Sequence, residues 1–357
     1  MKKLITVLLV LSLALLPLVG PAEGFDPKEF EGATLNVYNW GEYIDMKVVR
    51  DFEKLYNVLV NYKTFDSNED LWLQLTTGDS WDVVVPSDYM IERLIGANML
   101  QPLDKSIVTG WDGLVDEVRG LPFGPDNTYS APYFWQTIGI VYDTAKIPEE
   151  EMEAQGWDAL QNPDYAGHVY MYNSSRDAFM VAEKALGYSC NTTDEAEIMA
   201  AYEWLRSMHQ TVKPSYVTDE GIDAMAEGMN WLSVDYSGNA AYIISVNDRM
   251  SYCTPKQGTN IAVDAMVIPA NAKNPKLANV FISYIMTEEV SEAISVEVGY
   301  ASPNASVLET LSGPGGDYED NVAYLPRTGY ELDEIYVDLP SEWQGREPDL
   351  WIRVMAE

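Results

Sequence analysis

Residues 33–43 read ATLNVYNWGEY, a run in which apolar and polar side chains alternate up to Trp40 and are followed by a turn containing glycine. This alternation predicts a β-strand over residues 33–40. The turn brings together an indole, a carboxylate and a phenol, from Trp40, Glu42 and Tyr43. Aromatic faces and carboxylates both attract ammonium groups, so the turn is a candidate cage for an organic cation. The alternative is an amphipathic strand whose end packs in the core.

The segments that follow alternate between helical and strand-like periodicity. Asp45 is placed to cap a helix, and the stretch from Ser67 to Asp70 has the form of a capping box. The expected elements are a helix with an apolar face of Val48, Val49, Phe52, Leu55 and Tyr56, a strand over 58–65, a helix over 68–77 and a buried strand over 81–86. This order of strands and helices predicts an α/β fold with a parallel sheet covered by helices.

Ligands of such sheets bind beyond the carboxyl ends of the strands, where the strand order reverses. Two stretches follow predicted strands in this way, the turn at 40–43 and Ser87-Asp88-Tyr89. We therefore expect both stretches to line one ligand site.

The second half of the chain repeats the pattern less regularly. The expected elements are strands over 137–144, 229–236 and 261–269, and helices over 176–187, 194–209, 239–246 and 275–298, the last broken at Thr287. Asp264 falls inside one of these strands. Because aspartate is disfavoured in strand interiors, Asp264 is expected either to lie at a bend or to have a cationic partner.

The chain begins with Met1-Lys2-Lys3 and an apolar run over 4–19, followed by small residues. This pattern predicts a signal peptide over residues 1–24, since a membrane span needs ~20 apolar residues. The remaining residues, about 330, are enough for two domains or one large two-lobed one. Export would permit a disulfide between Cys190 and Cys253, but two free thiols are also consistent with a chain of this length.

The composition is strongly acidic, with 22 basic and 56 acidic residues and a net charge of −34. Nucleic acid and anionic membranes are therefore poor partners, since both would be repelled, and we expect no binding of nucleic acid; cations are attracted. The field of exposed charges decays within ~8 Å at physiological ionic strength. Selectivity for a cation must therefore come from a few carboxylates in a pocket.

The sequence contains few of the residues and motifs that enzymes use for catalysis. His168 and His209 are the only histidines, there is no cysteine cluster, and no glycine-rich phosphate loop is followed by lysine. A histidine-based metal site or a catalytic triad therefore has almost no residues to use. We predict that the protein is not an enzyme and that it has no metal site and no cofactor.

Six groups of residues form a pattern in this order along the chain: 38–43, 82–89, 186–188 with 191–194, 268–274, Gly299-Tyr300 with Pro303-Asn304, and 342–344. With these stretches the chain resembles the periplasmic spermidine/putrescine-binding proteins of polyamine ABC importers. The resemblance covers residue 33 to the C-terminus.

The resemblance implies a two-lobed type II periplasmic-binding-protein fold with the ligand clamped between the lobes. Lobe 1 is expected to comprise 33–136 plus 264–309, and lobe 2 to comprise 137–263 plus 310–357. The ligand-binding residues that it implies are Trp40, Glu42, Tyr43, Ser87, Tyr89, Asp177, Tyr236, Asp264, Tyr300 and Gln344.

Two positions depart from the family's pattern. Ala262 stands where the family tends to have a large aromatic residue, and Ser174 stands where spermidine binders have a second carboxylate. These departures favour a diamine over a long triamine.

The function implied is that of an exported, periplasmic and monomeric receptor that binds putrescine or spermidine and delivers it to a membrane ABC permease. A receptor for another organic cation or an amino-acid-like solute, and a secreted glycan-active protein, are the alternatives.

Overall fold

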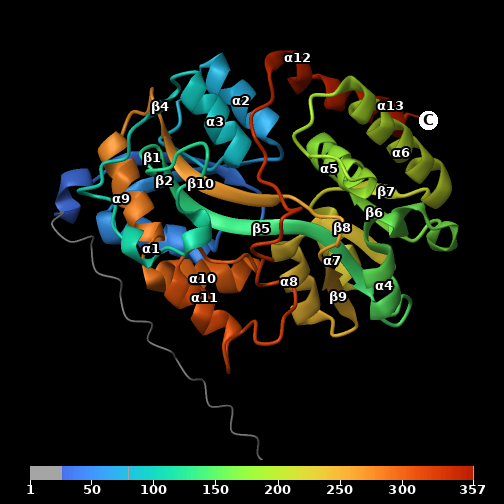
Figure 1. The fold of residues 1–357 in the computed structure, drawn as a ribbon. Coiled ribbons are helices and arrows are strands. Elements are labelled where there is room, and N and C mark those ends of the chain that lie inside the picture. Colours follow the sequence, from blue (N-terminus) through green and yellow to red (C-terminus); the bar gives the residue numbers. More distant parts are fainter. Residues whose placement is uncertain (1–25, 79, 357) are drawn as a thin grey trace, which may run out of the picture.

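The computed structural model describes residues 26–78 and 80–356, so the predicted signal peptide lies outside the described residues. A sheet of ten strands runs through both halves of the molecule (Figure 1). The strands are β1 (Thr34–Trp40), β2 (Leu59–Phe65), β3 (Val83–Val84), β4 (Leu100–Gln101), β5 (Ser130–Asp143), β6 (Val169–Tyr172), β7 (Ser215–Val217), β8 (Leu232–Tyr236), β9 (Met250–Cys253) and β10 (Ile261–Pro269).

The strands follow the order β2-β1-β3-β10-β5-β8-β6-β7, with β4 also paired to β10 and β9 to β5. At one end β1 is parallel to β2 and β3, and at the other end β6 is parallel to β7 and β8. The central strands β10 and β5 are antiparallel to all their neighbours. The predicted parallel pairing is therefore found in the outer parts of the sheet.

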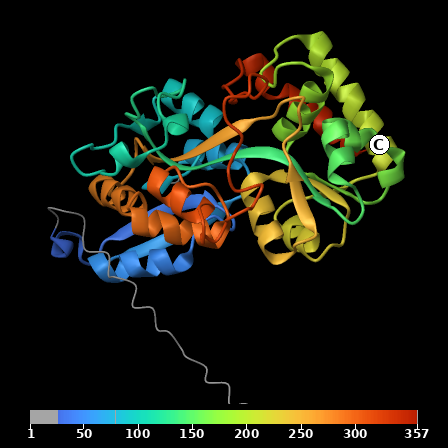
Figure 2. The same ribbon diagram turned by 60° about the horizontal axis from the view of Figure 1, so that its bottom comes forward.

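Helices cover both faces of the sheet in each half (Figures 1 and 2). Around β1 and β2, α2 and α3 lie on one face and α1, α9 and α10 on the other; around β8, α5, α6 and α13 lie opposite α7 and α8. The helices are α1 (Met46–Tyr56), α2 (Asn68–Thr77), α3 (Asp88–Gly96), α4 (Glu149–Gln155), α5 (Ser175–Leu186), α6 (Glu195–Val212), α7 (Glu220–Ala226), α8 (Ser237–Val246), α9 (Pro275–Ile285), α10 (Glu288–Val298), α11 (Ala305–Ser312), α12 (Ser341–Gln344) and α13 (Arg346–Met355).

The predicted helix starts are confirmed. The Asp45 side chain accepts a hydrogen bond from the Lys47 backbone N–H, and the Ser67 hydroxyl accepts one from the Asp70 N–H. These bonds satisfy amides that have no partner within the helix. The strand predicted over 81–86 is shorter, at Val83–Val84. On either side the Asp82 and Val85 N–H groups still donate to carbonyls of β1, whereas Pro86 has no N–H to donate.

Strand β5 connects the two halves. All 14 of its residues are buried; the first part, up to Thr137, pairs with β10, and the part from Ile138 pairs with β8. Figure 2 shows β5 and β10 running between the halves, beside a C-terminal segment drawn in red. In that segment Asp338 forms an ion pair with Arg93 of α3. The change of partner near residue 137 agrees with a crossing there, and the exact lobe boundaries stay a prediction.

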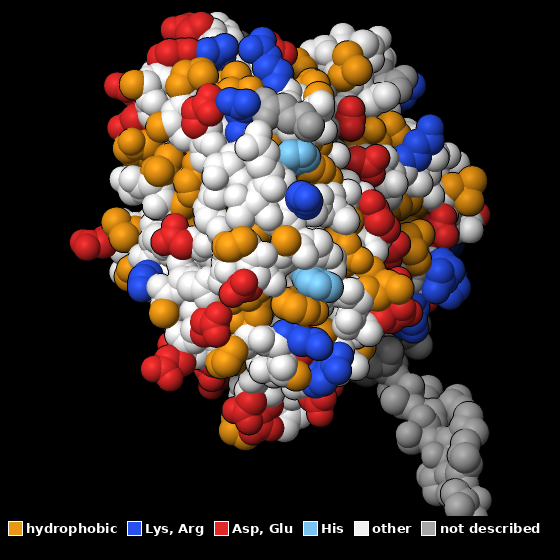
Figure 3. Space-filling model, turned by 90° about the vertical axis from the view of Figure 1, so that its right-hand side faces the viewer, with side chains coloured by type: hydrophobic (Ala, Val, Ile, Leu, Met, Phe, Trp, Pro, Cys, Tyr) orange, Lys and Arg blue, Asp and Glu red, His pale blue; other side chains and the backbone are white. Residues whose placement is uncertain are grey.

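The surface carries charges of both signs. Figure 3 shows the side of the molecule that lies to the right in Figure 1. Acidic and basic side chains are spread over this face, without a broad basic patch. Cys190 is buried and Cys253 half-buried, and both are free thiols. In the described ranges no helix has the length and apolar character needed to cross a membrane.

Candidate ligand-binding site

A cavity of about 330 Å3 lies between the two halves of the molecule, a size suited to a small ligand. It is lined by nine of the ten residues that the sequence indicated, from strand ends, the crossing strand β10 and the facing helix α5. These nine are Trp40, Glu42, Tyr43, Ser87, Tyr89, Asp177, Tyr236, Asp264 and Tyr300.

The turn after β1 forms one wall of the cavity. Trp40 packs against Phe65, with ring centroids 4.5 Å apart. Glu42 has a left-handed backbone, with φ of 45°, and its side chain is exposed at the edge of the cavity. Such a conformation is unfavourable for a residue with a Cβ and is found preferentially at functional sites. It lets the chain reverse so that Tyr43 points back into the core, where it is buried.

Tyr43 and Asp264 form the floor of the cavity. The Tyr43 hydroxyl donates to Asp264 Oδ2 over 2.6 Å, and the Tyr300 ring meets the Tyr43 ring edge-on at 4.7 Å. The Tyr133 hydroxyl donates to the Tyr43 backbone carbonyl at 2.6 Å and so fixes the turn from behind. Packing and hydrogen bonds thus hold the phenol in one position beside the carboxylate.

Asp264 is a buried carboxylate without a cation. Strand β10 has an irregularity in its pairing directly after Asp264, so the prediction of a bend is confirmed. Its side chain is 2% exposed, and no lysine or arginine of the described chain pairs with it. Burial raises the pKa of this carboxyl to about 6, against the opposing effect of the hydroxyls of Ser87 and Tyr43. Keeping the Asp264 carboxylate ionised while it is buried costs free energy, and a bound cation would offset this cost.

Asp177 is a second buried carboxylate, in the first turn of α5. The Tyr236 hydroxyl donates to its Oδ2 at 2.6 Å, and the Tyr336 hydroxyl donates to its Oδ1 at 3.0 Å. Burial raises the pKa of Asp177, while these hydroxyls and that of Ser174 act in the opposite direction. Two phenols therefore hold this carboxylate as Tyr43 holds Asp264.

Arg176 is the one cation among the residues that line the cavity. Its guanidinium lies 4.7 Å from the centre of the Tyr336 ring, its Nη2 donates to Asn191 Oδ1, and its Nη1 is 3.6 Å from Glu347 Oε1. Its Nη1 and Nη2 are therefore engaged by protein groups, while its buried Nε has no acceptor within the described residues.

Carboxylates dominate the lining of the cavity. Six carboxylate residues line it against one arginine, and the lining also includes many aromatic rings. The six are Glu42, Asp66, Glu69, Asp177, Asp219 and Asp264. Asp177 and Asp264 are buried, and the other four are exposed. A cavity with aromatic walls and an excess of negative charge favours a cationic ligand.

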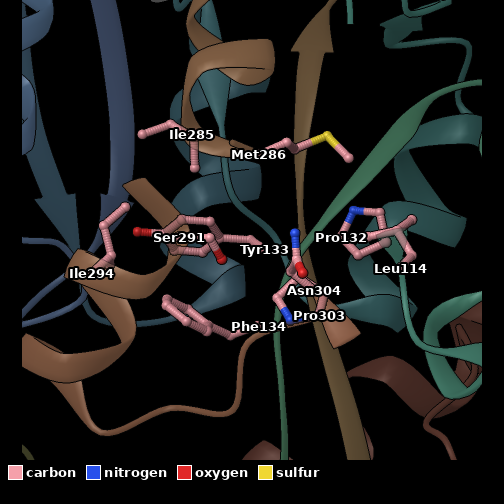
Figure 4. Close-up of a pocket in the computed structure, with 10 residues that line it drawn as sticks. All are labelled: Leu114, Pro132, Tyr133, Phe134, Ile285, Met286, Ser291, Ile294, Pro303 and Asn304. Atoms are coloured by element: carbon pink, nitrogen blue, oxygen red, sulfur yellow. The ribbon is translucent and has the colours of Figure 1, made fainter. Parts of the chain in front are cut away.

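A second cavity is too small for a ligand. Figure 4 shows it between the end of α9 and the loop at Pro303, lined mainly by apolar side chains such as Ile285, Met286 and Phe134. Its volume is about 10 Å3. A space of that size holds at most one water molecule.

Comparison with known proteins identifies the family of the chain. Residues 47–326 match the bacterial extracellular solute-binding proteins. The chain belongs to this family. The family is one of solute-binding proteins, and its extracellular location agrees with the export that the sequence suggested.

Relatives of this solute-binding protein carry more specific names. It is 32% identical to the spermidine/putrescine-binding periplasmic protein of Salmonella typhimurium over 281 residues, which is 78% of this chain and 80% of that protein. It is 30% identical to the putrescine-binding periplasmic protein PotF of Escherichia coli, over 79% and 81% of the two chains. The solved structure of the spermidine/putrescine ABC transporter substrate-binding protein PotD from Streptococcus pneumoniae superposes with a TM-score of 0.76 at 30% identity, covering 91% of this chain and 99% of that one. The predicted type II periplasmic-binding-protein fold is confirmed.

Gln344 is the indicated residue that this solute-binding protein does not bring to the cavity. Its amide donates to Asp338 Oδ1 at 3.0 Å and to the Leu339 carbonyl at 2.8 Å, so it stabilises the segment before α12. Other lining residues gave no signal in the sequence. Tyr336 belongs to an irregular segment without periodicity, and Trp351 of α13 is one apolar residue of an amphipathic helix.

The Tyr300 ring of the solute-binding protein lies directly against a glycine, which gives a test of the packing around the site. A Cβ added at Gly238 would lie 2.2 Å from atoms of the Tyr300 ring, whereas one added at Gly96 meets nothing within 4 Å. We expect Gly238→Ala to displace the ring and to lower the free energy of unfolding by about 1–3 kcal/mol. Gly96→Ala is the matched control, and urea unfolding measures both. Equal stability of the two variants would show that the ring is free to move.

Proposed function

We propose that this protein is an extracytoplasmic receptor that captures a polyamine, putrescine or spermidine, and delivers it to the membrane permease of an ABC importer. The observation that carries the proposal is the Asp264 carboxylate, which is buried among tyrosines and has no cationic partner in the described part of the chain. The names of the relatives point to the same class of ligand. We also propose that a cleaved signal peptide over residues 1–24 exports a monomeric protein to the periplasm.

The chemistry of a diamine matches the two buried carboxylates. Asp264 and Asp177 repel each other, since each is negative when ionised, and this repulsion contributes to the raised pKa of Asp264. A ligand with an ammonium group at each end would compensate both charges. A flexible chain of methylenes loses rotational freedom on binding, and aromatic walls offset this loss by burying its apolar surface.

The alternatives fit the cavity less well. An amino-acid-like solute would need a cation for its carboxylate, and Arg176 is already engaged by Glu347 and Asn191. A neutral glycan would leave Asp264 buried and unpaired, which is unfavourable. A role in binding without catalysis agrees with the family.

A thermal-shift screen tests the class of ligand. A ligand that binds only the folded state raises the melting temperature by mass action. We therefore expect millimolar putrescine or spermidine to raise the melting temperature, and neutral oligosaccharides and amino acids to leave it unchanged. A screen in which an oligosaccharide stabilises and no polyamine does would favour the glycan-active alternative.

Ligand binding is also expected to close the two lobes. We propose that residues 33–136 plus 264–309 move as one body, and 137–263 plus 310–357 as the other, as in hinged domain closure. Small-angle scattering should show a smaller radius of gyration after a polyamine is added to ligand-free protein. An unchanged radius together with unchanged tryptophan fluorescence would indicate a receptor that is closed before it binds.

A further inference from the structure

Gln136 of β5 lies in the floor of the cavity, directly opposite Ala262 of β10. Opposite residues of an antiparallel pair present their side chains on the same face of the sheet. The Gln136 side chain is thus next to the small methyl group of Ala262, and Gln136 is only 7% exposed. The Gln136 amide thus borders position 262, where the resemblance to polyamine receptors implies a large aromatic residue and this chain has alanine.

The amide of Gln136 is only half satisfied. Its Nε2 donates to Asp264 Oδ2 at 3.2 Å, the same oxygen that accepts the Tyr43 hydroxyl. Its Oε1 is buried and, within the described residues, accepts no hydrogen bond. Rotating the amide by 180° would point its oxygen at the carboxylate, so the bond to Asp264 fixes the orientation. A buried carbonyl oxygen without a donor is unfavourable and therefore calls for an explanation.

We propose that Gln136 determines specificity by accepting a hydrogen bond from the ligand, next to the charge of Asp264, and that the two together select a primary ammonium group. This inference rests on the proposed function and names the kind of amine at one end of the site. A primary ammonium has three N–H groups, enough to bond both the carboxylate and the amide oxygen. An N-methylated ammonium keeps two N–H groups, so it can bond both acceptors only with its methyl group held against the polar floor of the cavity, which is unfavourable.

The neighbouring polar groups do not replace Gln136. Within the described residues Asn260 Oδ1 is also buried without a donor, and it lines the cavity. Asn260 directly precedes β10, however, four residues before Asp264, which is a separation of about 13 Å in an extended chain. It therefore cannot bond the same ammonium group as Asp264. Ala262 between them offers no polar atom, and the hydroxyls of Ser87 and Tyr43 are already bonded to Asp264. Within the described residues the Gln136 oxygen is thus the neutral acceptor beside this carboxylate that has no donor.

The test compares two glutamine-to-methionine variants by calorimetric titration with putrescine and with N,N′-dimethylputrescine. Methionine keeps the approximate size of glutamine and removes its hydrogen bonds. Gln136→Met is expected to bind putrescine about tenfold more weakly than the wild type, which corresponds to about 1.4 kcal/mol. Gln101→Met is the control, because the Gln101 amide donates to the Pro269 carbonyl on the same sheet and does not line the cavity. It should bind like the wild type.

The methylated diamine separates recognition of the primary ammonium from a general effect on the site. The wild type should prefer putrescine to N,N′-dimethylputrescine, and Gln136→Met should reduce this preference about tenfold. A wild type that binds both amines equally, or a Gln136→Met variant with unchanged affinity for putrescine or an unchanged preference, would overturn the inference. The wild-type comparison needs no variant to fold. If the wild type binds no polyamine at all, the proposed function itself fails.

Discussion

Asp264→Asn is expected to weaken polyamine binding by about 2–5 kcal/mol, the usual loss when one partner of a buried charge pair is removed. The carboxylate lies at the floor of the cavity and has no cation of its own in the described chain. Asparagine preserves the shape of the side chain and can still accept the Tyr43 hydroxyl. The variant therefore removes the charge and leaves the packing. Calorimetric titration of ligand-free protein measures the loss.

The same substitution should not destabilise the ligand-free protein. Because burial raises the pKa of Asp264 to about 6, ionisation of this carboxyl at pH 7 costs the folded state more free energy than ionisation of an exposed aspartate, and a neutral side chain relieves that cost. Asp143→Asn is the matched control: Asp143 is equally buried but lies 3.5 Å from Arg249, outside the cavity. It should lose stability and keep its affinity. If Asp264→Asn instead melted at a lower temperature and bound normally, Asp264 would be a structural residue.

Putrescine affinity is expected to fall as the pH drops below about 6, approaching tenfold for each pH unit. The ligand stays protonated throughout this range, since alkyl ammonium groups titrate near pH 10. In the free protein Asp264 becomes protonated below about pH 6, and binding must then displace that proton. Above about pH 6 Asp264 is already ionised, so its titration should no longer change the affinity. Titration calorimetry between pH 4.5 and 8 gives the profile.

The pH profile of the wild type alone does not isolate Asp264, because burial also raises the pKa values of Asp88 and Asp177. The difference between the wild type and Asp264→Asn isolates one group. A carboxyl with a raised pKa stabilises the folded state when it is protonated, and this contribution is lost as the pH rises through about 6. The ligand-free wild type should therefore lose stability relative to Asp264→Asn between about pH 4 and 6. A difference that does not change with pH would show that Asp264 does not titrate there.

The sequence identified the parts of the site that follow from local rules. Trp40 is the last residue of β1 and Ser87 follows shortly after β3, and the carboxyl ends of parallel strands meet at one edge of a sheet. Asp264 was conspicuous because aspartate is rare inside strands, and the structure explains it by an irregular pairing at that residue. Local periodicity also predicted the helix starts at Asp45 and Ser67, whose caps depend only on neighbouring residues.

The parts that the sequence did not reveal depend on contacts between distant segments. The pairing of Gln136 with Ala262 requires the register of β5 against β10, which neither strand specifies alone. Tyr336 reaches Asp177 from an irregular segment that returns between the two halves. Gln344 was indicated by resemblance to relatives, yet in this chain its amide bonds Asp338 and the carbonyl of Leu339.

Calorimetric titration of the ligand-free wild type at pH 7.5 tests the central claim most directly. Putrescine and spermidine should each bind at one site per chain, while maltose and glutamate should produce no binding heat. The predicted order, from the departures at Ala262 and Ser174, is putrescine tighter than spermidine. Saturable binding of a diamine that disappears in Asp264→Asn would support the account. No binding of either polyamine, or equal binding of glutamate, would contradict it.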